Sequence, residues 1–88
     1  MPKVHELKIW PEHFTDILNG IKKYEVREDD RGFGLGDRLL LLEWDPRTKE
    51  FTGRHCEVGV VHISHVYQLR NLFPYFPNVC VMGIEVLA

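Results

Sequence analysis

The sequence predicts an α+β domain built as a small, mostly antiparallel and partly closed β-barrel with one helix near its N-terminus. Segments with alternating or continuous apolar residues recur along most of the 88 residues, and one amphipathic helical stripe separates the first two. Many strands in so short a chain must close on themselves or leave hydrophobic edges exposed. A partly closed barrel avoids such edges, so we expect a single domain over residues 1–88.

The first strand and the helix follow from a change in the period of the apolar residues. Polar and apolar residues alternate over 5–10, which indicates a half-buried strand. Pro11 suits the first position of a helix and Gly20 is a typical stop signal, so we expect a helix over 12–19. Its apolar stripe consists of four side chains at helical spacing: Phe14, Ile17, Leu18 and Ile21.

The second strand, expected over 22–28, again alternates between two kinds of residue. Tyr24 and Val26 share one face of it, whereas Glu25 and Arg27 share the other. Charged side chains are rarely buried, so we expect the charged face to point outward.

Three further strands complete the expected sheet. A continuous apolar run over 37–44, bounded by turn signals, indicates a strand that is buried on both faces. Apolar β-branched residues dominate the later part of the chain, where we expect a strand over 56–66 with Gly59 as a candidate bulge. The last apolar run predicts a strand over 79–87.

The segment 29–36 is expected to be a loop, and its three glycines favour positive φ angles or close backbone approach. In one interpretation, the loop is a plain connection with Phe33 packed inward. In the other, Arg31 and the backbone amides border a ligand cleft. The segment does not match a nucleotide-binding glycine motif, because no Gly-Lys-Ser/Thr follows it.

Composition excludes several classes of protein. The formal net charge of −2 excludes the basic surface of a non-specific DNA-binding protein, although a local basic patch remains compatible with it. No apolar run approaches 18 residues and the N-terminus lacks a signal-peptide pattern, so we expect a cytoplasmic protein with no membrane partner.

The metal-ligating residue types are few and widely spaced. Cys56 and Cys80 have no CxxC spacing, so we expect both to be reduced and unpaired. His62 and His65 stand three apart on a predicted strand and should face opposite ways. We therefore expect no metal site and no cofactor.

The strongest local signal is the run from Gly20 to Arg27, which joins the helix stop to a strand. Glu25 and Arg27 are two apart, so they lie side by side on one strand face. Arg27 offers a planar fork for phosphate or carboxylate, and Lys22 could neutralise a phosphate. Glu25 could orient either cation or accept a hydrogen bond from a base edge. The alternative is an exposed ion pair of little consequence.

This pattern, Gly-x-Lys-x-x-Glu-x-Arg followed by Gly-Asp at the start of an apolar strand, resembles the ASCH domain of the PUA-like superfamily of small β-barrels. The residues that carry the resemblance are Gly20, Lys22, Glu25, Arg27, Gly36 and Asp37. The fuller run from His5 to Pro11, together with Asp30, Arg31 and Phe33, is similar to a compact bacterial and phage branch known only as a domain of unknown function. The resemblance extends from His5 to about Leu87.

The resemblance implies a PUA-like pseudo-barrel with a cleft between the helix and the barrel. PUA-like domains commonly bind RNA, so it also implies RNA or a nucleotide as the partner. We expect the cleft to be lined by Lys22, Glu25, Arg27 and Arg31. Tyr75, next to Phe76 and between two prolines, could stack on an unpaired base, or the two rings could plug the open barrel end.

Two other functions remain open. Some ASCH domains are amidohydrolases of modified nucleosides that use the motif lysine with a threonine and a glutamate. Lys22 matches the lysine, Glu25 replaces the threonine, and Glu57 is a candidate for the glutamate. A desolvated Lys22 favours this enzyme and a solvated one favours binding, whereas an exposed apolar patch favours a protein-interaction module.

Overall fold

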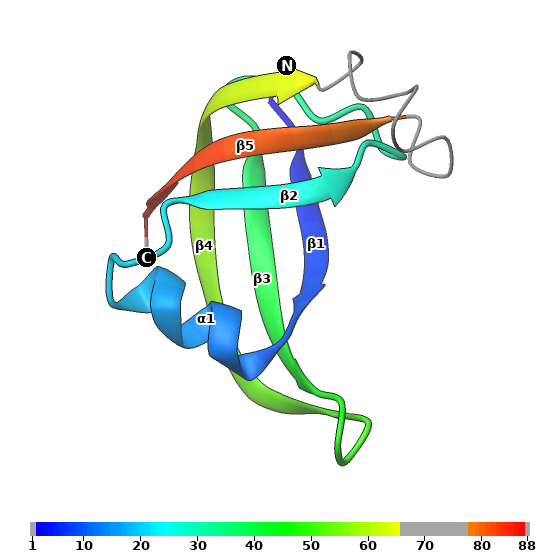
Figure 1. The fold of residues 1–88 in the computed structure, drawn as a ribbon, viewed down its shortest axis with the longest axis vertical. Helices are drawn as coiled ribbons and strands as arrows, with labels where there is room; N and C mark the ends of the chain where they lie inside the picture. Colours follow the sequence, from blue (N-terminus) through cyan, green and yellow to red (C-terminus); the bar gives the residue numbers. More distant parts are fainter. Residues whose placement is uncertain (1, 66–77, 88) are drawn as a thin grey trace.

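The computed structural model describes residues 2–65 and 78–87, and within them five strands form one mixed sheet with one helix beside it (Figure 1). The elements in chain order are β1 (Val4–Ile9), α1 (Pro11–Leu18), β2 (Tyr24–Glu28), β3 (Arg38–Asp45), β4 (Glu50–His65) and β5 (Val79–Val86). The strand order is β1-β3-β4-β5-β2, in which β1 and β3 are parallel and the other neighbours are antiparallel. The predicted α+β class, with its helix between the first two strands, is confirmed.

Strand β4 joins the two halves of the sheet. Its first part pairs with β3, and its last part, from Val58 onward, pairs with β5. The register against β5 shifts between Val60 and His62, where one extra residue forms a bulge that bends the strand. Beyond this bend β5 and β2 cross in front of β1 and β3 (Figure 1). The sheet therefore curls into the expected partly closed barrel, although the bulge lies at Val61 and not at Gly59.

The inner face of the curled sheet carries the core. Buried side chains alternate along the strands, because successive strand residues point to opposite faces. Helix α1 adds Phe14 and Ile17 to this core, and each is 1% exposed. The largest fully buried side chains are Phe14, Ile17, Leu39, Leu41, Met82, Val58 and Cys80.

Two side chains of the expected helical stripe lie outside the core. The helix is only eight residues long, little more than two turns, and Gly20 turns the chain away with a φ of 72°. Leu18 is 47% exposed and Ile21 is 73% exposed. The predicted four-residue stripe is thus wrong at these two positions.

Within the described residues, no helix is long and apolar enough to span a membrane.

The prediction that β3 is buried on both faces is also wrong. Leu39 and Leu41 are fully buried, but Leu40 and Leu42 are partly exposed, since the core lies against one face only. The inner face even includes a charged residue, Glu43, which is 5% exposed. A run of leucines cannot reveal which face of a strand is covered.

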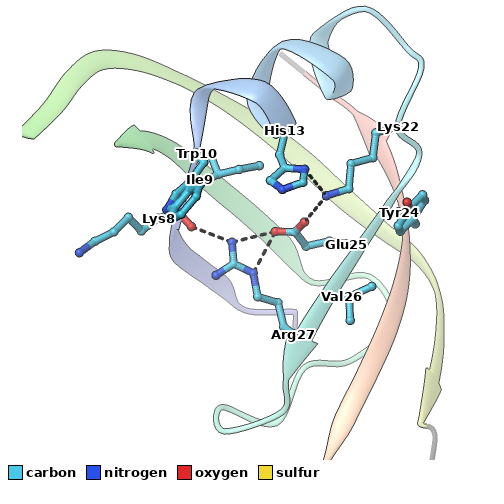
Figure 2. A pocket seen from close by; sticks show the side chains of 9 residues that line it. All are labelled: Lys8, Ile9, Trp10, His13, Lys22, Tyr24, Glu25, Val26 and Arg27. Carbon is cyan, nitrogen blue, oxygen red and sulfur yellow. Dashed lines mark hydrogen bonds and ion pairs between the residues drawn. The ribbon is translucent and has the colours of Figure 1, made fainter. Parts of the chain in front are cut away.

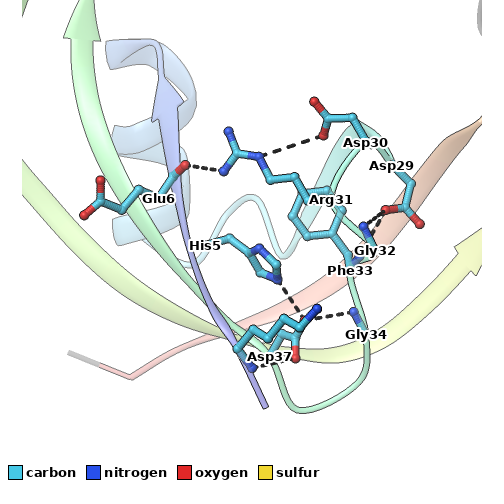
Figure 3. A network of polar contacts seen from close by, with 10 residues as sticks. His5, Glu6, Asp29, Asp30, Arg31, Gly32, Phe33, Gly34 and Asp37 are labelled. Atoms are coloured by element: carbon cyan, nitrogen blue, oxygen red, sulfur yellow. Dashed lines mark hydrogen bonds and ion pairs between the residues drawn. The ribbon is translucent and has the colours of Figure 1, made fainter. Parts of the chain in front are cut away.

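The loop between β2 and β3 is fastened at both ends by Asp–His pairs. Asp37 Oδ2 lies 2.9 Å from His5 Nε2 on β1 (Figure 3). At the other end, Asp29 Oδ2 lies 2.8 Å from His65 Nε2 on β4. These pairs hold the loop against β1 at one end and against β4 at the other.

The backbone amides of this loop are bound by its own carboxylates. Asp29 accepts from the amides of Gly32 and Phe33, and Asp37 accepts from that of Gly34 (Figure 3). Phe33 is 6% exposed, so the interpretation with Phe33 packed inward is confirmed. These three amides are already used by the protein and do not form a cradle for a ligand. Two of the loop glycines, Gly32 and Gly36, adopt the predicted positive φ.

The two anchoring carboxylates share an electrostatic property. Burial by itself raises the pKa of Asp37, but hydrogen bonds from His5 and from two backbone amides outweigh it and hold the pKa below the usual 3.8. The pKa of Asp29 is lowered in the same way, by His65 and two loop amides against the effect of burial. Both groups therefore favour the folded state in their charged form.

Both cysteines lie in the core as free thiols, as predicted. Burial raises the pKa of Cys56 and of Cys80, and the negative charge of Asp29 raises that of Cys80 further. Because the thiolate is the reactive form, these thiols are protected in the folded protein.

Acid should weaken the fold through the two loop anchors. Since the pKa values of Asp29 and Asp37 in the folded protein lie below 3.8, their contribution to stability is present above that pH and is lost as the pH falls below it. We expect the urea midpoint of unfolding to fall between about pH 5 and pH 3, and to fall less in Asp37→Asn. Asp30→Asn, which changes a side chain that is 67% exposed, should follow the wild-type profile. Parallel profiles for Asp37→Asn and the wild type would contradict this role.

Candidate ligand pocket between the two sheet edges

The curled sheet brings its edge strands, β1 and β2, to a common pocket of about 580 Å³ that also touches α1 (Figure 2). This volume is in the usual range for sites that bind small molecules. The polar residues that line it are Lys8, His13, Lys22, Glu25 and Arg27. The apolar ones are Ile9, Trp10, Tyr24 and Val26.

The charged face of β2 points toward this pocket. Glu25 is 3% exposed, whereas Tyr24 and Val26 are each 50% exposed. The predicted alternation is therefore correct, but its sense is wrong, because the charged face is the inner one. The reason is tertiary: Glu25 meets basic side chains and the edge of β1, and the ion pairs formed there offset the burial of its charge.

Glu25 is the centre of a polar network (Figure 2). Its Oε2 accepts from Nε of Arg27 at 2.9 Å and lies 2.7 Å from Nη2, which makes a two-pronged contact. Its Oε1 accepts from Nζ of Lys22 at 3.3 Å. The same Nζ lies 3.2 Å from Nδ1 of His13. An ammonium can only donate, so we assign the ring proton of His13 to Nε2.

Arginine side chains bridge the seam between β1 and β2. Arg27 donates from Nη2 to the carbonyl of Lys8 at 2.7 Å, and Arg31 donates to the carbonyl of Glu6 at 2.6 Å. Carbonyls two residues apart on a strand point to the same edge. The two guanidinium groups therefore bind two carbonyls on the open edge of β1, where β2 supplies no ladder hydrogen bonds.

The pocket has an excess of positive charge. Among the described residues, two basic side chains, Lys22 and Arg27, face one carboxylate, that of Glu25, whereas the ammonium of Lys8 lies outside the pocket over the Trp44 ring. The side chain of Lys22 is 13% exposed and that of Arg27 is 27% exposed, so both are largely desolvated but still reachable. Among the described residues, Nη1 of Arg27 has no hydrogen-bond partner. An anion would find both charge and free donors here.

Flat aromatic surface lies beside these charges. Trp10 is 51% exposed and Tyr24 is 50% exposed, and Nζ of Lys22 lies 5.3 Å from the centre of the Tyr24 ring. Half-exposed rings next to cations are typical of sites that stack a nucleobase and hold its phosphate.

The free edge of β2 adds backbone groups to the pocket wall. The carbonyl of Lys23 accepts from the amide of Ile84, so odd-numbered residues of this strand exchange hydrogen bonds with β5. In an antiparallel ladder the residues between them direct their amides and carbonyls to the other side. Tyr24 and Val26 therefore offer one donor and one acceptor each toward the seam.

The structure brings together some of the predicted site residues and separates others. Three of them meet in the pocket: Lys22, Glu25 and Arg27. Arg31 does not line it and instead contacts Glu6. Glu57 lies on β4 in an ion pair with Arg38 at 3.3 Å, and is not among the lining residues. Tyr75 and Phe76 lie outside the described residues.

Three residues that line the pocket were missed in the sequence analysis: Lys8, Trp10 and His13. All three lie within six residues of one another around Pro11 and approach Lys22 only after the sheet curls. For this reason, no local pattern in the sequence marks them.

Over residues 2–65 and 78–87, no three His, Cys, Asp or Glu side chains gather closely enough to hold a metal ion.

Comparison with solved structures identifies the fold as that of an ASCH domain. The crystal structure of hypothetical protein PH0355 matches with a TM-score of 0.65 and 18% identity, over 97% of this chain and 99% of that one. A mutant of the ASCH protein from Zymomonas mobilis matches with a TM-score of 0.63 and 15% identity, over 93% of this chain and 68% of that one. These likenesses confirm the expected PUA-like architecture.

A family model matches residues 4–84, and the chain belongs to that family, which is described as a domain of unknown function (DUF3850). It is also 38% identical over 64 residues to an uncharacterized 12.9 kDa protein in the GpA 3′ region of Escherichia phage P2. This match takes in 73% of the present chain and 57% of the phage protein. The expected kinship with a domain of unknown function that occurs in phages is confirmed.

Glu25 should be important for stability as well as for the pocket. Glu25→Gln keeps the shape of the side chain but leaves Lys22 and Arg27 without their charged partner, so we expect a loss of about 1–3 kcal/mol in the free energy of unfolding. The matched control is Glu57→Gln, which breaks an exposed ion pair and should lose less than about 1 kcal/mol. Urea unfolding measures both variants, and equal losses would show that Glu25 is not the centre of the network.

Proposed function

We propose that the protein binds a nucleotide or a short single-stranded RNA in the pocket between β1 and β2. The observation that carries the proposal is the buried carboxylate of Glu25, which holds Lys22 and Arg27 side by side in a pocket with half-exposed aromatic rings. A carboxylate buried in this way orients cations, and oriented cations are suited to phosphate.

The division of the pocket suits the two ends of a nucleotide. Lys22 and Arg27 provide the charged end, where a phosphate would take the free donors of both side chains. Tyr24 and Trp10 provide flat surfaces for a base, and the free edge of β2 at Val26 offers a donor and an acceptor to the base edge. Since the protein as a whole has a net charge of −2, this local excess of cations would direct nucleic acid to the pocket.

Binding should depend on salt and on the two motif cations. Each phosphate contact on a single strand adds about 0.7 to the slope of log affinity against log salt, so two contacts give about −1.4. Lys22→Ala and Arg27→Ala should each weaken binding about ten-fold and flatten the slope by about 0.7. Lys23→Ala, which removes an exposed neighbouring lysine that does not line this pocket, is the matched control.

Fluorescence titration with a mononucleotide and with short RNA, at two or more salt concentrations, makes this test. Wild-type affinity for the Lys23→Ala control and reduced affinity for the other two variants would support the proposal. No binding at low salt, or binding that neither variant changes, would reject it and leave a protein-interaction module as the better account.

A second candidate function, hydrolysis of an amide on a modified nucleoside, is favoured by one observation. The side chain of Lys22 is only 13% exposed, as expected for a catalytic lysine. Because Lys22 donates to Glu25 and to His13, its role would be to stabilise the oxyanion that forms when water adds to the acyl carbon. The C–N bond would then break, and the leaving amine would take the proton that the attacking water gives up.

Incubation with an N-acylated nucleoside, followed by ultraviolet absorbance, tests this second candidate. We expect Lys22→Ala to abolish any hydrolysis and Lys22→Arg, which keeps the positive charge, to retain part of it. Equal loss in both variants would instead point to Lys22 as a nucleophile, and no hydrolysis by the wild type would leave binding as the function.

A further inference from the structure

A row of aromatic side chains leads from the pocket across the outer face of the sheet. Trp44 on β3 lies directly opposite Phe51 on β4. In the parallel register Lys8 lies beside Leu42, and the same register continued by two residues places Trp10 beside Trp44. The backbone of Trp10 is still extended, so its side chain falls on the same outer face as that of Lys8. We call Trp10, Trp44 and Phe51 the aromatic row.

The aromatic row is open to solvent. Trp10 is 51% exposed, Phe51 is 56% exposed and Trp44 is partly exposed. Neighbouring strands lie about 4.8 Å apart, so three strands in a row span roughly 10 Å. Aromatic side chains displayed on neighbouring strands of an open sheet face are a common way to stack successive unpaired bases.

Lys8 connects the aromatic row to the pocket. Its ammonium lies 4.3 Å from the centre of the Trp44 ring and 5.9 Å from that of Phe51. Its carbonyl is held by Arg27, and Lys8 also lines the pocket (Figure 2). A cation over an exposed ring is weakly held, so a base can displace it and leave it free to contact the adjoining phosphate.

We propose that the aromatic row is a second binding site, which stacks the bases next to the one held in the pocket. The ligand is then a single strand of two or more unpaired nucleotides and not a free mononucleotide. This inference rests on the proposed function of the pocket. An RNA strand fits the row better than an apolar protein segment, because Lys8 lies over its centre and the row is continuous with a cationic pocket.

Trp10 is shared by the pocket and the row, whereas Trp44 belongs to the row alone, so the two tryptophans of the chain can distinguish the two sites. Trp44→Phe leaves only Trp10, at the pocket, and Trp10→Phe leaves only Trp44, in the row. Both changes keep a ring for stacking. Uridine monophosphate should quench Trp10 and leave Trp44 unchanged, whereas hexauridylate should quench both.

Affinity measurements add a test that does not depend on fluorescence from the row. Phe51→Ala should weaken hexauridylate binding about five- to 100-fold and leave uridine monophosphate binding unchanged. Lys22→Ala should weaken the binding of both ligands. Val61→Ala, at another exposed apolar position of β4, is the matched control and should change neither affinity. Thermal unfolding checks that each variant is folded.

The outcomes separate the row from the pocket. Quenching of Trp10 without Trp44, together with wild-type hexauridylate affinity in Phe51→Ala, overturns the row and leaves the pocket proposal standing. If hexauridylate quenches Trp44 and Lys22→Ala does not change this quenching, the row is supported and the pocket proposal is overturned. Failure of both ligands to bind overturns both proposals. A Trp44 signal that changes with protein concentration alone overturns the row as an RNA site, because it is then a contact between copies.

Discussion

The ion pair between Glu25 and Arg27 is the interaction on which the rest of the site depends. Arg27 contacts Glu25 through Nε and Nη2, and Nη2 also donates to the carbonyl of Lys8, so Arg27 joins the two edge strands of the sheet. Without it, β1 and β2 would face each other with open edges and a buried charge between them. Arg27 therefore ties β1 to β2, and its partner Glu25 positions both Arg27 and Lys22 in the pocket.

Closure by side chains, and not by a backbone ladder, explains why a pocket exists at all. The five described strands make four pairings, and a fifth pairing between β1 and β2 would close the seam completely, as in a fully closed barrel. Arg27 and Arg31 span the seam at two points on β1 instead, and the space between the strands stays open under α1. Because no backbone ladder pairs β1 with β2, a cavity lined by charged and aromatic groups remains between them.

The loop over 29–37 follows the C-terminal end of β2 and supports the contact between β1 and β2 from there. Its carboxylates bind its own amides and two histidines from the other strands, and Phe33 fills the space beneath it. The loop presents Arg31 to β1 from this rigid base. Glycines that suggest a ligand cradle in the sequence therefore serve to hold a structural arginine in place.

The helix and the strands could be predicted from the period of the apolar residues and from Pro11 and Gly20, because these signals depend only on neighbouring residues. The spacing of Lys22, Glu25 and Arg27 also marked these three residues as a group. The sequence could not decide which face of β2 is buried, because alternation is the same in either sense and only the position of β1 makes the charged face the inner one. For the same reason Lys8, His13 and Trp10 were invisible as pocket residues. Arg31 belongs to the run that resembles the family but contacts β1 outside the pocket, because β1 and β2 are opposite edges of the sheet and come together only when the sheet curls. Neighbouring residues determine the helix, the strands and the candidate side chains, and the curl of the sheet decides which of these side chains meet.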